Sequence, residues 1–296
     1  MKKLLLCIIS FLFLSTNAQT SKNKESLTNS LLFEVSGNGL SRPSYIFGTY
    51  HLIGKDFWQK YPVLESCFNK VSAVAGEIVV GDELQMQQQL MPYMLLKDQT
   101  LDKLFSQDQF KEINSVFKKE SGMNLSILNG LKPAAIQLTL LSFIAPKEIS
   151  PGNPPLDGYI QNLARENKKE VIGLETLEEQ AEIIFDIPEE RQKEQLLKFV
   201  EQLEKNREEG NRLLKAYKEQ NLAELEHLFK QSADFNDEEM NRMLFERNYK
   251  WSQKLPVIMK RGPVFIAVGA GHLVGEKGLL RILQNQGYEI KPLLLK

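Results

Sequence analysis

Short apolar runs and longer amphipathic stretches alternate along the chain. Runs typical of strands cover residues 31–35, 44–47, 73–80, 170–174, 264–268 and 288–295, and the first two form a predicted hairpin around the turn at 36–39. Helical periods cover residues 84–145, which we expect to pack on the sheet, and 188–260. The pattern therefore predicts one α/β domain over residues 29–296. Its central mixed sheet is built from both chain ends and flanked by helices, with a helical cap at 188–260.

Composition is that of an ordinary globular protein. Of 296 residues, 42% are hydrophobic and 25% are charged, which excludes a disordered chain and a protein with many membrane spans. Lys and Arg number 37 against 38 Asp and Glu. This balance leaves no basic excess of the kind that nucleic-acid binding needs, so we expect no nucleic-acid partner.

The N-terminus has the layout of an export signal. Two lysines precede an apolar run at residues 4–14, and small residues follow at 15–18, so we predict a signal peptide over 1–18 and a polar linker over 19–28. The alternative is an uncleaved anchor, but about 11 apolar residues fall short of the roughly 20 that cross a bilayer. Cleavage would leave Cys67 without a disulfide partner, because Cys7 lies in the signal. We expect a periplasmic or secreted protein with no stable membrane insertion.

Two of the three histidines close a Gly-x-x-His motif directly after an apolar strand. They are His51, after residues 44–47, and His272, after residues 264–268. Either one alone is more simply a hydrogen-bonded residue at a strand end, but the pair indicates a shared site, because ligands bind beyond strand ends in such sheets. His227 lies among acidic residues on a charged helix and is expected at the surface.

Glu77 interrupts the apolar run at 73–80. A charged carboxylate in such a strand needs a partner, which could be a buried Lys or Arg or a metal ion. Further along, Arg247 and Asn248 fill a turn of the helix around 237–254 where its apolar stripe would otherwise continue. Arg247 could also simply extend along apolar surface to water. Asp157 is interpreted as a helix N-cap. Glu175 and Gln180 flank a predicted capping box at residues 176–179 and could face the same opening as the histidines.

Several of these motifs together resemble the TraB/PrgY/GumN family, which includes the Tiki metalloproteases. The resemblance covers nearly all of the chain after the signal. It rests on residues 31–35 and 43–52, on Gly76 with Glu77, on 173–180, on Arg247 and Asn248 with Trp251, and on 268–275 and 278–288. It implies His51, Glu77 and His272 as metal ligands, with Glu77, Arg247 and Asn248 as catalytic residues.

Two imidazoles and one carboxylate suffice to hold a divalent metal with open positions, which can activate water for hydrolysis. The resemblance implies a peptide or protein substrate, with manganese or cobalt rather than zinc. We therefore expect an exported, metal-dependent, peptidase-like hydrolase. Two alternatives stay open: metal-free general-base hydrolysis by a His–Glu pair, and a non-catalytic protein that binds or sequesters peptides in the same cleft.

Overall fold

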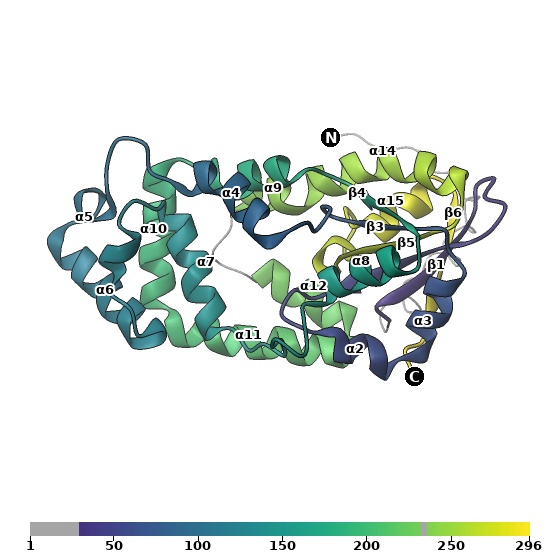
Figure 1. Ribbon diagram of the computed structural model, residues 1–296, viewed down its shortest axis with the longest axis horizontal. Helices are drawn as coiled ribbons and strands as arrows, with labels where there is room; N and C mark the ends of the chain where they lie inside the picture. The colour runs from purple at the N-terminus through teal and green to yellow at the C-terminus, as the bar shows by residue number, and fades with distance from the viewer. Residues whose placement is uncertain (1–29, 232–235) are drawn as a thin grey trace, which may run out of the picture.

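Six strands form one mixed sheet at one end of an elongated molecule (Figure 1). The computed structural model describes residues 30–231 and 236–296, so the predicted signal peptide (1–18) and linker (19–28) lie outside the described residues. The strand order is β4-β3-β5-β2-β1-β6. The strands are β1 (Leu32–Gly37), β2 (Ser44–Thr49), β3 (Ala73–Gly76), β4 (Glu170–Gly173), β5 (Val264–Gly269) and β6 (Tyr288–Leu293).

Both ends of the chain contribute to this sheet, which confirms the predicted α/β fold with a mixed sheet flanked by helices. β1 pairs antiparallel with β2, as the predicted hairpin, and with β6. β5 pairs in parallel with β2 and β3, and β3 pairs in parallel with β4. The carboxyl ends of these four parallel strands therefore meet at one edge of the sheet.

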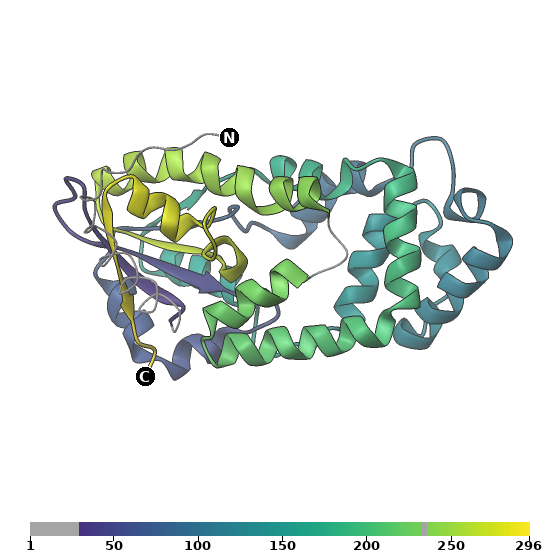
Figure 2. The ribbon, with the colours of Figure 1, turned by 180° about the vertical axis from the view of Figure 1, so that it is seen from behind.

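Helices cover the two faces of the sheet and bury its apolar side chains. Helices α2 (Lys55–Lys60), α3 (Pro62–Asn69) and α8 (Leu156–Glu166) lie on one face, and α14 (Glu246–Arg261) and α15 (Leu279–Asn285) on the other (Figures 1 and 2). On the first face, the Trp58 ring packs edge-on against Phe47, Phe265 and Phe68. These contacts form the main core, which holds the strands rigidly beneath their carboxyl ends.

The helices of residues 84–145 do not pack on the sheet, and that expectation was wrong. They form the far end of the molecule with a core of their own, in which Ile136 and Leu140 are grouped with Leu196 and Phe199 (Figure 1). These helices are α4 (Glu83–Met94), α5 (Leu101–Leu104), α6 (Gln107–Ser121), the 3₁₀ helix η1 (Leu125–Leu128) and α7 (Pro133–Ile144), with α10 (Glu189–Glu201). They pack on other helices: α7 packs on α10 and α6, and α4 packs on α9 (Leu177–Phe185).

The stretch predicted as a helical cap, residues 188–260, is helical where it is described, but its parts lie in different places. Helix α10 packs on α7, whereas α14 packs on α15 beside the sheet. Between them run α11 (Leu203–Lys218), α12 (Leu222–Gln231), α13 (Asp237–Met240) and the π-helix η2 (Asn241–Phe245). Helix α11 connects the two ends of the molecule (Figure 2), and its buried Tyr217 donates a hydrogen bond to the carbonyl of Gly48.

Strand β3 is shorter than the predicted strand at 73–80. It ends at Gly76, because the backbone then leaves the sheet and takes side-chain partners. The Gln161 side chain accepts from the Val80 N–H and donates to the Ile78 carbonyl. Glu77 therefore lies directly after a strand end, and not within the strand as expected.

No helix of the described residues combines the length and the apolar character that crossing a membrane requires.

Candidate active site

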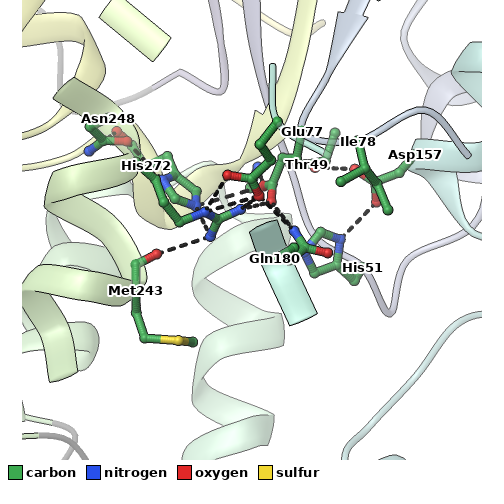
Figure 3. Close-up of polar contacts among 12 residues, drawn as sticks. Thr49, His51, Glu77, Ile78, Asp157, Gln180, Met243, Asn248 and His272 are labelled. Atoms are coloured by element: carbon green, nitrogen blue, oxygen red, sulfur yellow. Dashed lines mark hydrogen bonds and ion pairs between the residues drawn. The ribbon is translucent and has the colours of Figure 1, made fainter. Parts of the chain in front are cut away.

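Three strand ends bring His51, Glu77 and His272 together at one edge of the sheet (Figure 3). Thr49 at the end of β2 is paired with Gly269 at the end of β5, and Gly76 at the end of β3 is paired with Ala267. His51 follows β2 by two residues, and His272 closes the 3₁₀ helix η3 (Ala270–His272) that follows β5. Parallel pairing thus joins residues from both ends of the chain.

The glycine that opens each Gly-x-x-His motif is required by close packing. A methyl group on Gly48 would lie 2.8 Å from Leu273 Cδ1 and 3.2 Å from Ala270 Cα, so the first motif packs directly against the second.

Gly269, which opens the second motif, lies against all three predicted ligands. A methyl group here would lie 3.1 Å from Glu77 Oε1, 3.7 Å from His272 Cδ2 and 3.9 Å from His51 Nε2. The three side chains therefore converge on one small space.

Glu77 is buried and accepts three hydrogen bonds. Its Oε1 accepts from the Gly269 N–H at 2.8 Å, and its Oε2 accepts from Gln180 Nε2 at 3.2 Å and from Arg247 Nη2. Burial alone would raise the pKa of Glu77, but His272, His51 and Arg247 outweigh it and lower the pKa to about 2. The side chain is a carboxylate at neutral pH.

His272 is a neutral imidazole with a fixed tautomer. Burial lowers its pKa to about 3. Arg247 Nη1 donates to its Nε2 at 3.0 Å, and its Nδ1 lies 2.8 Å from Asn248 Oδ1. Asn248 Nδ2 donates to the carbonyls of His272 and Lys277, which turns Oδ1 towards the ring. The proton therefore lies on Nδ1, and the Nε2 lone pair faces the side of Glu77.

His51 lies at the open side of the site. Its side chain is 67% exposed, whereas those of Glu77 and His272 are 8% and 5% exposed. Its Nδ1 donates to Asp157 Oδ2 at 3.0 Å, and Asp157 raises the pKa of His51 to about 9. Asp157 Oδ1 also accepts from the Thr49 hydroxyl at 2.7 Å. This arrangement holds the ring by Nδ1 and turns Nε2 towards Glu77.

Arg247 links the whole cluster through its guanidinium. It donates from Nε and Nη2 to Glu175, at 3.0 Å and 2.6 Å, in addition to its bonds to Glu77 and His272. Its Nη1 also donates at 3.0 Å to the carbonyl of Met243, which belongs to the π-helix η2. Such wide helical turns are frequent at functional sites. Arg247 is thus a buried residue whose charge is balanced by ion pairs. It does not extend along apolar surface to reach water.

The structure places the predicted site residues unequally. His51, Glu77 and His272 lie together (Figure 3), and Arg247 bonds to Glu77 and His272. Asn248 reaches the cluster through His272 and so orients that ring. His227 on α12 is exposed, as expected.

Three further side chains complete the site: Asp157, Glu175 and Gln180. Asp157 was expected to be an N-cap, but α8 has Pro155 at that position and the Asp157 carboxylate binds His51 instead. Glu175 follows β4 as Glu77 follows β3, and it lies with Gln180 on the side of the histidines, as expected. Gln180 donates to both carboxylates, at 3.2 Å and 3.1 Å.

The donor chemistry of the site suits a divalent metal. Each histidine is held through Nδ1 by an oxygen acceptor, the usual arrangement around metal-binding imidazoles. At neutral pH the buried Glu77 and Glu175 share one guanidinium, so the buried part has a surplus negative charge. Over residues 30–231 and 236–296, however, no three His, Cys, Asp or Glu side chains are placed as they would be around an ion. The Arg247 guanidinium lies against both Glu77 and His272.

The comparison to known proteins identifies one family. The model of the TraB/PrgY/gumN family matches residues 31–292. The chain therefore belongs to the TraB/PrgY/gumN family. Neither the curated proteins nor the solved structures contain a match.

Proposed function

We propose that the protein is an exported, metal-dependent hydrolase of the peptidase type. The observation that carries this proposal is the pair of histidines, each fixed at Nδ1 by a hydrogen bond, with both Nε2 atoms on the side of the Glu77 carboxylate. His51, Glu77 and His272 would hold the metal, and the surplus negative charge of the buried cluster favours a cation there. Because the pKa of His51 is raised to about 9, the metal would have to displace the proton from its Nε2. When bound, a divalent metal supplies Lewis acidity and lowers the pKa of water.

The protein's own residues would do the rest of the chemistry. Asp157 and Asn248 orient the two imidazoles, and Gln180 holds the Glu77 carboxylate. Glu77 has a second possible role as general base, because its carboxylate is ionised at neutral pH. Substrate would approach from the side of His51, the one exposed member of the group.

A decisive test compares three variants of the mature chain. In His272→Ala and Glu77→Gln we expect cleavage of a mixed peptide library in the presence of Mn²⁺ to be lost, as read by mass spectrometry. The matched control is His227→Ala, which removes the exposed third histidine and should leave metal content and cleavage unchanged. Circular dichroism confirms folding in each case. If Glu77→Gln retains metal but not cleavage, Glu77 is the base.

Two outcomes would contradict the proposal. Full-rate cleavage by metal-free wild type would favour general-base catalysis by the His–Glu pair. If no peptide is cleaved, the non-catalytic peptide binder takes its place, and one observation favours that alternative: Arg247 already occupies contacts of Glu77 and His272.

Export is the second part of the proposal, supported by the apolar run at residues 4–14 between two lysines and small residues. N-terminal sequencing of protein from the cell envelope should begin near Gln19. An intact Met1 would contradict cleavage.

A further inference from the structure

Arg247 and a metal ion would compete for the same atom. The Nε2 of a neutral imidazole has one lone pair, and in the structure that lone pair accepts from Arg247 Nη1 at 3.0 Å. The other terminal nitrogen, Nη2, binds Glu77 Oε2. A guanidinium is a permanent cation with donors only, so it cannot share these contacts with a divalent ion.

A cavity beside the guanidinium offers it a second position. The cavity has a volume of about 170 Å³, several times the roughly 30 Å³ of one water molecule, and Arg247 is part of its wall. Glu175, Glu179, Glu182 and Glu246 also line it. One oxygen of Glu179 accepts from the Thr176 N–H and one oxygen of Glu246 accepts from Asn241, which leaves each a second oxygen. Ionised carboxylates with free lone pairs are suitable partners for a guanidinium that leaves Glu77 and His272.

Two of the three other cations that line this cavity donate to backbone carbonyls and not to those carboxylates. Lys254 donates to the carbonyl of Leu174 at 2.6 Å, and Arg242 donates to the carbonyls of Glu182 and Asp186. Lys250 lies at the exposed rim. Glu175 belongs both to the present ion pair and to the cavity wall, so it can hold the Arg247 side chain in either position.

We propose that Arg247 is a built-in competitor of the metal: its guanidinium occupies the contacts shared by Glu77 and His272, and it withdraws into the neighbouring cavity, pivoting on Glu175, when a divalent cation binds. This inference rests on the metal-dependent part of the proposed function. It also reconciles the ion-pair arrangement of the site with a metal-binding role for the same residues.

The test measures Mn²⁺ binding to the mature chain by isothermal titration calorimetry. We expect Arg247→Gln to bind Mn²⁺ at least about tenfold more tightly than wild type, because the lone pair of His272 is released. Removing a positive charge would by itself favour a cation, so the double variant Arg247→Gln/Glu175→Gln is compared as well. It preserves the net charge of the cluster, because it removes Arg247 together with one of the two carboxylates that Arg247 binds, and it should still bind more tightly.

Two further variants test the effect of losing a positive charge elsewhere and the need for free space in the cavity. Lys277→Gln removes a cation that contacts the Phe245 ring, and its affinity should equal that of wild type. Ile183→Trp places a large ring in the cavity wall and should weaken Mn²⁺ binding about tenfold. In the Arg247→Gln background the same substitution should have no effect, since no guanidinium needs the space.

The results distinguish a failure of this inference alone from a failure of the proposed function. If wild type binds Mn²⁺ through His272 and the charge-balanced double variant binds no more tightly, the competition is overturned while the metal site stands. If neither wild type nor the Arg247 variants bind Mn²⁺, the inference and the metal-dependent function fail together.

Discussion

Gly269 offers a direct test of the site's geometry, because alanine is compatible with its backbone. Its φ of −52° and ψ of 135° are open to any residue, so Gly269→Ala introduces no backbone strain. The new methyl group would lie 3.1 Å from Glu77 Oε1, closer than ordinary van der Waals contact. The carboxylate would have to shift by a few tenths of an ångström, which lengthens its hydrogen bond from the Gly269 N–H.

The expected result is a folded protein with an impaired site. Loss of chain entropy in the unfolded state favours alanine by about 0.4–1 kcal/mol, which offsets much of the crowding, so the melting temperature should change by only a few degrees. Misplacing a group that orients a metal site typically costs about 10–100-fold in affinity or activity, and we expect that loss in Mn²⁺ titration and peptide cleavage.

Gly48→Ala is the matched comparison, because the same change there meets packing and not the ligands. Its methyl group would lie 2.8 Å from Leu273 Cδ1 and 3.2 Å from Ala270 Cβ. Overpacking of this kind costs about 1–3 kcal/mol, which lowers the melting temperature by several degrees. Unchanged Mn²⁺ affinity in folded Gly269→Ala would refute the reasoning, since the three side chains could not then converge on that point.

Two pH-dependent predictions follow from other charged pairs. Asp157→Asn should return the pKa of His51 from about 9 towards 6.5, as read from the histidine ring signals in an NMR titration; an unchanged value would mean that Asp157 is not the cause. Arg191 lowers the pKa of Glu239 through a bidentate ion pair at 2.7 and 2.8 Å. The unfolded state therefore binds more protons, and the stability from this pair is present above about pH 4.3 and is lost as the pH falls. Glu239→Gln should flatten the acid limb of a urea-midpoint profile, and an identical limb would contradict this.

The sequence identified those parts of the site that follow from local pattern. Strand ends with Gly-x-x-His could be located from apolar runs, and their pairing followed from the rule that parallel strands present their carboxyl ends at one edge. Partners that are distant in sequence could not be found in this way. Asp157 lies 106 residues from His51. Its position near the start of a helix suggested a cap, and only the tertiary structure shows that its carboxylate lies beside the His51 ring.

Two errors about the fold have the same physical origin. Amphipathic helices in residues 84–145 have an apolar stripe, but a stripe does not specify whether a sheet or another helix covers it. The apolar run at 73–80 likewise continues past Gly76, where the pairing of β3 with β5 stops. The sequence pattern predicts which side chains are buried, but tertiary contacts determine which helix or strand covers them.

The parallel pairing of β2 with β5 has a consequence for folding order. Thr49 and Gly269 are neighbours in the sheet but lie near opposite ends of the chain, and β1 is bordered by the C-terminal strand β6. Contacts between such distant residues require closure of a very long loop and form slowly. A nascent chain that lacks its last strands has the hairpin of β1 and β2 but no parallel partner for β2 and no histidine from η3, so the cluster cannot assemble until synthesis is almost complete. A shortened chain ending before β6 would expose the backbone of β1 along an open sheet edge, which favours aggregation.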